Sequence, residues 1–424
     1  MDALQIARRA QEASKVTAAA ATERKDHAVR AMAGRLASNK ERILAANERD
    51  ISEARKKNLR DSLVDRLRLT AGKIEARMRA LEKIAALPDP VGRCFRGKSL
   101  PNGLRVSRTR VPLGVILMIY EARPHVTVNS GALCLKSGNA AILRGGSEVR
   151  RCNELLGGLW RQSLEQAGLP GDSIQVISGS HQQVRDLLSQ DGLIDLVIPR
   201  GGEGLVRAVS KDSKIPVIKH YSGVCHVYLD VIADIEKGIE IALDSKCLMP
   251  EVCNAMETLL VSTGLSGRLQ AVVEAFERCG VRVKGCERTR SVVGRVEPAS
   301  EADWRTEYLD NIVSVKMVND VREAAEHINL YGSHHTDSIV TEDRENAREF
   351  TRRVDSAVVL VNASTMFCDG ESLGMGAEIG ISTDKIHARG PMGLEELTSY
   401  KLVIHGSGHV MGEPPAFRPA SETV

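Results

Sequence analysis

The chain has 424 residues, of which 42% are hydrophobic and 27% charged, a composition that can bury the cores of two or three globular domains. Its net charge of +3 and its aromatic content of 3% disfavour nucleic-acid binding as the main function. The nine cysteines include no Cys-x-x-Cys pair, which argues against a disulfide framework and a zinc ribbon. No apolar run approaches the roughly 20 residues of a membrane span, and the N-terminus lacks the apolar core of a secretion signal. We therefore expect a protein of the reducing cytoplasm.

Residues 1–87 are predicted to form helices, because apolar residues recur near a 3.6-residue period until the chain reaches Pro88. Ser38 and Asn39 precede a charged turn and indicate a helix cap there. Further along, Asn102-Gly103 lies between apolar residues and predicts a hairpin with a two-residue turn.

From about residue 113 short apolar strands and helices alternate. The predicted strands of this series are 115–119, 140–143, 174–177, 193–198 and 216–218, with helices over 148–167 and 182–189. A second series begins near residue 224, with strands at 258–261, 312–318, 338–341 and 358–361 and helices at 235–242, 268–278 and 321–330. Non-alternating apolar strands joined by helices predict parallel sheets covered on both faces. Residues 400–405 are predicted to form a lone strand.

Three motifs suggest nucleotide or metal binding, but their surroundings favour other interpretations. Residues 92–99 (GRCFRGKS) match the phosphate-loop pattern, yet no strand precedes them and Pro101 follows, so we interpret the match as chance. Residues 374–380 (GMGAEIG) nearly match a dinucleotide fingerprint but favour a glycine-rich loop near the active site, because no strand directly precedes them. The adjacent His334 and His335 would point apart, which favours a surface or loop pair over a metal site.

Cys253 is a candidate nucleophile. It lies between Pro250, which breaks a helix, and an apolar strand. A cysteine at such a bend, beside backbone amides, can have a lowered pKa and be open to a substrate. Most cysteines are small core residues, so composition alone does not select this one among nine.

Segments spread over most of the chain resemble the gamma-glutamyl phosphate reductases of proline biosynthesis, a family within the aldehyde dehydrogenase superfamily. These segments are 111–124 (VPLGVILMIYEARP), 135–148, 198–202, 252–260 (VCNAMETLL), 331–337, 376–383 and 387–397, in the order of the family. The helical N-terminus fits as well. The resemblance therefore covers essentially the whole chain.

The resemblance implies an α/β fold like that of the aldehyde dehydrogenases. A Rossmann-like NADPH-binding domain would comprise residues 1–96 and 113–222, and an α/β catalytic domain residues 223–395. Residues 97–112 and 396–408 would form a small oligomerisation sheet, which implies a homo-oligomer, and residues 409–424 a tail. The implied reaction is the NADPH-dependent reduction of L-glutamyl 5-phosphate to L-glutamate 5-semialdehyde with release of phosphate. Glutamate 5-kinase is a candidate partner.

Two alternatives stand beside this interpretation. The first is another acylating or aldehyde-oxidising dehydrogenase of the same superfamily. The second is a catalytically weak scaffold that binds the kinase. Phosphate dependence of the reverse reaction separates the first alternative from the reductase.

The resemblance also implies roles for individual residues. Cys253 matches the nucleophile whose thiolate attacks the acyl carbon and expels phosphate, and Asn254 belongs to the same catalytic motif. The implied cofactor residues are Arg144, Gly145, Gly146, Ser147, Gly201, Gly202 and Glu307. Of these, Arg144 suits the 2′-phosphate of NADPH and Glu307 the nicotinamide ribose. The implied substrate-binding residues are Arg123, His220, Ser364 and Thr365, and no metal is implied.

At three positions the sequence departs from related patterns. His125 stands where the family commonly has asparagine, and Met366 stands where it commonly has arginine. His220 takes the place of the glutamate that activates water in hydrolytic aldehyde dehydrogenases. A reductase that works from an acyl phosphate has reason to lack that base, because water attack would waste the thioester.

Overall fold

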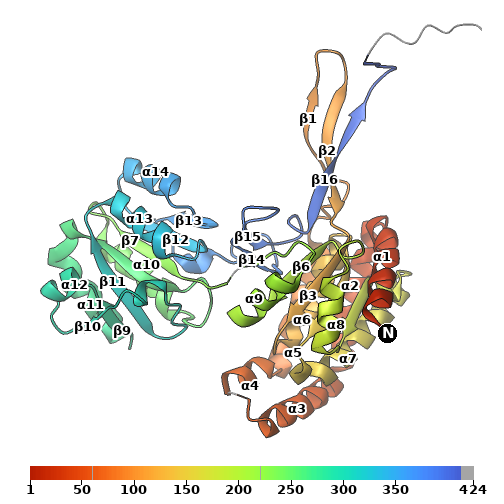
Figure 1. Ribbon diagram of the computed structural model, residues 1–424, viewed down its shortest axis with the longest axis horizontal. Coiled ribbons are helices and arrows are strands. Elements are labelled where there is room, and N and C mark those ends of the chain that lie inside the picture. Colours follow the sequence, from red (N-terminus) through yellow and green to blue (C-terminus); the bar gives the residue numbers. More distant parts are fainter. Residues whose placement is uncertain (60, 220, 412–424) are drawn as a thin grey trace, which may run out of the picture.

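The computed structural model describes residues 1–59, 61–219 and 221–411, which form two α/β lobes and a projecting arm of strands (Figure 1). Lobe one begins with the helices α1 (Ala3–Ala18), α2 (Thr22–Ser38), α3 (Lys40–Lys56), α4 (Asp61–Leu67) and α5 (Ala71–Ala86). The helical prediction for this region is confirmed. Asn39 does precede α3, but its side chain donates back to the carbonyl of Arg35 at 2.9 Å and does not cap the helix.

A parallel sheet of four strands in the order β5-β4-β3-β6 forms the centre of lobe one. Its strands are β3 (Val115–Tyr120), β4 (Ala140–Gly145), β5 (Ile174–Ile177) and β6 (Leu196–Arg200). The predicted strand at 216–218 is wrong, since only a single bridge joins Val217 to Val197. The carboxyl ends of β3, β4 and β6 are in register at Tyr120, so the residues that follow them meet at one edge.

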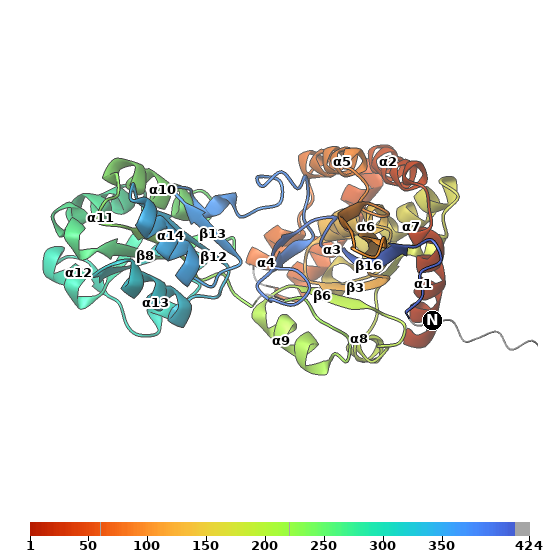
Figure 2. The same ribbon diagram turned by 90° about the horizontal axis from the view of Figure 1, so that it is seen from above.

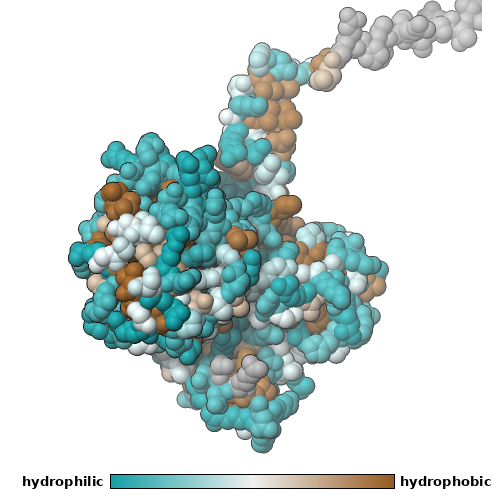
Figure 3. All heavy atoms as spheres, turned by 60° about the vertical axis from the view of Figure 1, so that its left-hand side comes forward, coloured by the Kyte–Doolittle hydropathy of each residue, from teal (hydrophilic) through white to brown (hydrophobic). Residues whose placement is uncertain are grey.

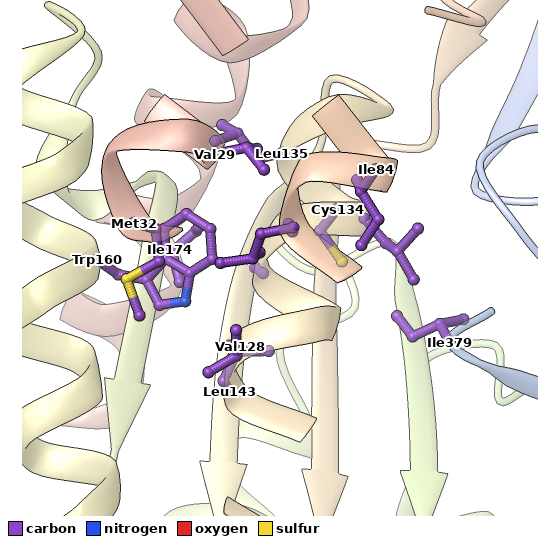
Figure 4. Close-up of a cluster of buried hydrophobic side chains, with 14 of the residues drawn as sticks. Val29, Met32, Ile84, Val128, Cys134, Leu135, Leu143, Trp160, Ile174 and Ile379 are labelled. Carbon is purple, nitrogen blue, oxygen red and sulfur yellow. The ribbon is translucent and has the colours of Figure 1, made fainter. Parts of the chain in front are cut away.

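Helices cover both faces of this sheet, which explains why its strands are apolar without alternation. Ile116 and Met118 pack in one core with α2, α5, α6 (Pro124–Lys136) and α7 (Arg150–Gln166). Figure 4 shows part of this core, including Val29, Leu135 and Trp160. Leu117 faces the opposite core, which is formed with α1, α8 (His181–Leu188) and α9 (Glu203–Asp212). Figure 2 shows α2 and α5 on one side of the sheet and α8 and α9 on the other.

Lobe two contains a parallel sheet of seven strands in the order β10-β9-β11-β8-β7-β12-β13. The strands are β7 (Cys225–Leu229), β8 (Met256–Ser262), β9 (Arg282–Gly285), β10 (Glu297–Pro298), β11 (Ile312–Val318), β12 (Thr336–Val340) and β13 (Val358–Val361). The helices are α10 (Ile235–Cys247), α11 (Leu269–Arg278), α12 (Glu287–Val292), α13 (Val321–Tyr331) and α14 (Arg344–Arg353). Val227 and Tyr228 belong to different cores, so this sheet too is covered on both faces.

The projecting arm is an antiparallel sheet of β1 (Cys94–Ser99), β2 (Arg105–Pro112) and β16 (Thr398–His405). The predicted hairpin is present, but Leu100 and Leu104 close a three-residue loop in which Gly103, not Asn102, has a positive φ of 90°. The strand near 400–405 is not alone, because it pairs with β2 along its whole length. β1 also confirms that residues 92–99 are no phosphate loop, since a strand stands where that motif needs a helix.

A small two-stranded sheet, β14 (Gly380–Ser382) with β15 (Gly390–Met392), lies between the lobes (Figure 1). Residues 374–379 form turns that lead into it. Apolar side chains are exposed along the arm, among them Leu402 and Ile404 (Figure 3). In the part of the chain that the structure describes, no helix combines the length and apolar character needed to cross a bilayer.

Candidate active site

Cys253 lies in the loop between α10 and β8 and is half-buried. It lines a cleft of about 440 Å³ between the lobes, together with Asn254, Arg200 from lobe one, Glu378 and residues 366–369. We call this space the Cys253 cleft. The prediction that residues 374–380 form a glycine-rich loop near the site is confirmed, since Glu378 lines the cleft.

Two segments far from Cys253 in sequence fix its backbone. A Cβ atom on Gly223 would lie 1.7 Å from the carbonyl oxygen of Cys253, so this close approach requires glycine. The amide of Gly223 donates to Oε1 of Glu307 at 2.8 Å, while burial raises the pKa of the Glu307 carboxyl. The thiol of Cys225 donates to the same Cys253 carbonyl at 3.3 Å. Cys253 is therefore held by contacts on its backbone, which leave its side chain facing the cleft.

The amide nitrogens around Cys253 differ in their partners. Those of Val252 and Ala255 donate to nearby carbonyls. Among the described residues, the amides of Cys253 and Asn254 donate to no protein acceptor. Two unpaired amides beside a nucleophile can stabilise an oxyanion on the carbon that it attacks.

The side-chain amide of Asn254 is directed at backbone carbonyls and not at the Cys253 sulfur. Its Nδ2 donates to the carbonyls of Thr365, Met366 and Cys368, each at 3.3 Å. Asn254 therefore ties the nucleophile loop to the segment that forms the opposite wall of the cleft.

Ser364 and Thr365 lie behind this wall and do not line the cleft. Both are buried, and the hydroxyl of Ser245 donates to Ser364 Oγ and accepts from the Thr365 amide, each at 3.1 Å. Their contacts shape residues 366–369. This placement favours a supporting role for Ser364 and Thr365 over the direct substrate contact that the resemblance implied.

Lobe one brings Arg123 to the other side of the nucleophile loop. Arg123 follows Ala122, a non-glycine residue with a φ of +42° whose amide donates to Glu148 Oε1 at 2.7 Å. Strained residues of this kind are typical of functional sites. Burial first, and then the nearby guanidinium groups of Arg200 and Arg66, lower the pKa of Arg123 to about 10. Arg123 therefore remains charged at neutral pH.

Six of the seven expected cofactor residues gather at the carboxyl ends of β4 and β6, whereas Glu307 lies in lobe two against Gly223. Gly202 is the N-cap of α9, no side chain caps that helix, and a Cβ atom on Gly202 would meet open space. Gly201 leaves no space for a side chain, because a Cβ atom there would lie 2.4 Å from Glu121 Oε2. A helix N-terminus after a parallel strand fits the diphosphate of a dinucleotide, although the Gly202 amide here already donates to Glu121 Oε2 at 2.9 Å.

Arg144, at the end of β4, donates to the carbonyl of Gly179 at 3.1 Å, and its Nε is buried with no partner among the described residues. This orphaned donor fits an additional acceptor from a ligand. Gly145 and Gly146 are closely packed, since a Cβ atom on Gly145 would lie 2.0 Å from Asn153 Nδ2 and one on Gly146 would lie 2.0 Å from Glu148 Oε1. Ser147 is exposed at the start of the next turn.

The two family departures lie in different clefts. Met366 lines the Cys253 cleft and gives it no charge. His125 lines a second cleft, of about 530 Å³, together with Arg66, Lys73, Arg77, Arg123, Asp65 and Glu251. We call this space the basic cleft. Burial, and then the surrounding cations, lower the pKa of His125 to about 4, so its imidazole is neutral at pH 7 and can hydrogen-bond much as asparagine does.

The structure also tests the remaining sequence predictions. His220 lies outside the described residues. His334, with a φ of +59°, and His335 both lie in the loop before β12, as expected of a loop pair, although His335 is fully buried and not at the surface. Glu121 was not singled out, although its Oε2 accepts from the amide of Gly202 at 2.9 Å and links the ends of β3 and β6. The sequence signal that could have identified Glu121 is its position directly after an apolar strand, at the edge where the site residues gather.

Comparison with known proteins places this geometry in a family. The family model for the aldehyde dehydrogenases matches residues 1–290, so the chain belongs to the aldehyde dehydrogenase family. The chain is 49% identical over 405 residues to a gamma-glutamyl phosphate reductase of Desulforapulum autotrophicum, covering 95% of this chain and 97% of that protein.

Two crystal structures of gamma-glutamyl phosphate reductases are similar as well. The enzyme of Thermotoga maritima is 42% identical, with a TM-score of 0.95 and coverage of 97% of this chain and 100% of that chain. The enzyme of Saccharomyces cerevisiae is 33% identical, with a TM-score of 0.55 and coverage of 98% and 100%. These similarities confirm the fold and the resemblance that the sequence segments indicated. The chain is therefore an oxidoreductase of a family that uses a nicotinamide cofactor.

Proposed function

We propose that this chain reduces L-glutamyl 5-phosphate with NADPH to L-glutamate 5-semialdehyde and phosphate, as a step of proline biosynthesis. The relative at 49% identity supports the substrate. The observation that carries the proposal is the placement of Cys253 in a cleft between the lobes, with the amides of Cys253 and Asn254 unpaired among the described residues.

Cys253 performs the first chemical step. Its thiolate attacks the acyl carbon, a carbon–sulfur bond forms, and the bond to the phosphate oxygen breaks as phosphate leaves with the electron pair. The amides of Cys253 and Asn254 stabilise the oxyanion of the tetrahedral intermediate. Phosphate is a good leaving group, so this step needs little acid assistance.

Residues at the carboxyl ends of the lobe-one strands hold the cofactor. The α9 N-terminus at Gly202 accepts the diphosphate, with Gly201, Gly145, Gly146 and Ser147 forming the surrounding turns. Arg144 pairs with the 2′-phosphate, which favours NADPH over NADH. Glu307 holds the nicotinamide ribose. NADPH held by these residues would supply a hydride to the thioester carbon, and cleavage of the carbon–sulfur bond would then release the semialdehyde and restore the Cys253 thiolate.

The remaining site residues position the reacting groups. Asn254 holds the nucleophile loop against residues 365–368 through its three carbonyl contacts. Ser364 and Thr365 lie behind residues 366–369, which line the cleft, and support them through Ser245. Arg123 meets the substrate from the lobe-one side. His220 is assigned to the substrate side by its sequence position alone.

We also infer the setting in which the protein works. The exposed apolar side chains of Leu402 and Ile404 on the arm support a homo-oligomer joined through β16. The unpaired cysteines and the biosynthetic role support a cytoplasmic location. The kinase that supplies the acyl phosphate is the candidate partner.

The reverse reaction tests the function. Purified protein receives pyrroline-5-carboxylate, which is in equilibrium with the semialdehyde, together with NADP⁺ and varied phosphate, and NADPH formation is measured by absorbance. We expect activity that requires phosphate. Equal activity without phosphate would identify an aldehyde-oxidising dehydrogenase instead. No activity under either condition, with a folded protein, would favour the scaffold.

A further inference from the structure

The basic cleft lies across the nucleophile loop from the Cys253 cleft. Within one short stretch of chain, Glu251 lines the basic cleft while Val252 and Cys253 line the other. Lobe one supplies the facing wall from α4, α5 and the start of α6. At about 530 Å³, this space can accommodate a phosphate or a carboxylate with its hydration.

Cations dominate the lining of the basic cleft. Arg66, Lys73, Arg77 and Arg123 face it, against the carboxylates of Asp65 and Glu251. Among the described residues, the guanidinium groups of Arg66, Arg77 and Arg123 make no ion pair and donate no hydrogen bond. Some arginines elsewhere on the surface do find partners, as Arg295 does with Glu277 at 2.8 Å. Unpaired guanidinium forks are suited to bidentate recognition of an oxyanion.

The electrostatics of the cleft point the same way. Burial lowers the pKa of Arg77, and burial together with neighbouring guanidinium groups lowers that of Arg123. Crowded, partly desolvated like charges are unfavourable alone and gain from a bound anion. Arg123 also interacts with the Cys253 thiol, which places the basic cleft within electrostatic range of the reacting sulfur.

The Cys253 cleft has the opposite charge. Among the described residues, Asp244, Asp369 and Glu378 line it, and Arg200 is the one cation there. Met366, at the position where the family commonly has arginine, adds no charge there. An anionic group of a substrate acylating Cys253 is therefore favoured on the side of the basic cleft.

We propose that the basic cleft binds an oxyanion of the acyl-phosphate substrate, either its carboxylate or its phosphoryl group, through Arg66 and Arg77 beside Arg123. This assignment rests on the proposed function for the identity of the substrate. It gives Arg66 and Arg77 a binding role that their positions in α4 and α5 do not indicate.

Steady-state kinetics of the reverse reaction tests the substrate contact. We expect Arg77→Gln and Arg66→Gln each to raise one KM by about 10- to 100-fold, the effect of losing a charged hydrogen bond. A rise in the KM for phosphate assigns the phosphoryl group to the cleft, and a rise in the KM for the semialdehyde assigns the carboxylate. Arg77→Lys should recover only part of the loss, because an ammonium group lacks the guanidinium fork. Arg79→Gln, on the exposed side of α5, is the matched control and should match the wild type.

A second measurement does not depend on turnover. Cys253 is alkylated with anionic iodoacetate or neutral iodoacetamide, and the rate at its peptide is followed by mass spectrometry. We expect the ratio of the two rates to fall in Arg77→Gln and in Arg66→Gln but not in Arg79→Gln. The ratio cancels changes in thiol reactivity that affect both reagents equally.

The two measurements separate the possible failures. If both KM values stay within twofold of the wild type in folded Arg66→Gln and Arg77→Gln, the proposal is overturned, whatever the alkylation ratio. If the wild type shows no phosphate-dependent activity but the ratio falls in both variants, the anion site stands and the proposed function fails. An unchanged ratio in that case overturns both.

Discussion

Gly223→Ala is expected to damage catalysis by displacing the nucleophile. In the structure the added Cβ atom would lie 1.7 Å from the Cys253 carbonyl oxygen and 2.6 Å from its Cα atom, whereas such contacts essentially never fall below 3.0 Å. The backbone at Cys253 must therefore move by about 1 Å, because the obstructing atoms are main-chain atoms that no rotamer change can remove. A misplacement of about 1 Å at a reacting group can cost roughly 100-fold in rate.

We therefore expect the kcat of the reverse reaction to fall by about 100-fold in Gly223→Ala. The alkylation rate of Cys253 should change as well, since the amides around the sulfur move with it. Gly267→Ala is the matched control in the same lobe, because its Cβ atom would meet no atom within 4 Å. Thermal unfolding and circular dichroism establish that both variants fold.

Glu307→Ala extends the same reasoning without adding bulk. It removes the acceptor of the Gly223 amide, so we expect a lower kcat together with weaker NADPH binding. A folded Gly223→Ala variant with a kcat within twofold of the wild type would refute the geometric argument.

Three further predictions concern single side chains. Cys253→Ala should abolish turnover while leaving NADPH binding nearly intact, and Cys247→Ala should remain active; the reverse pattern in initial rates would reassign the nucleophile. Arg144→Ala should raise the KM for NADPH far more than that for NADH, whereas equal weakening would show that this side chain does not contact the 2′-phosphate. Because the folded-state pKa of His125 is lowered from 6.5 to about 4, its contribution to stability is present above pH 6.5 and is lost as the pH falls toward 4. Between pH 7 and pH 5 the wild type should therefore lose about 2 kcal/mol more unfolding free energy than His125→Asn, measured by urea unfolding, and equal losses would contradict the buried neutral imidazole.

The sequence by itself determined most of the elements of the fold. Strands such as 115–119 and 258–261 were recognisable because both of their faces are buried, which makes every position apolar. The periodicity did not predict α6, because eleven of its thirteen residues are buried and no polar face remains to mark the period. The local sequence pattern therefore predicts an element when one of its faces is exposed, or when a fully buried element is as short as a strand.

Tertiary structure alone decided what surrounds the nucleophile. Nothing in the sequence near Cys253 indicates that Gly223 packs closely against its carbonyl or that Glu307 accepts a hydrogen bond from Gly223. These contacts join three segments that are far apart in the sequence. Likewise Arg77 is one of many charged helix residues in the sequence, and only the packing of α5 against the start of α6 brings it to Arg123. Contacts of this kind leave no periodic signal along the chain, because they depend on where whole elements pack rather than on which residues are neighbours.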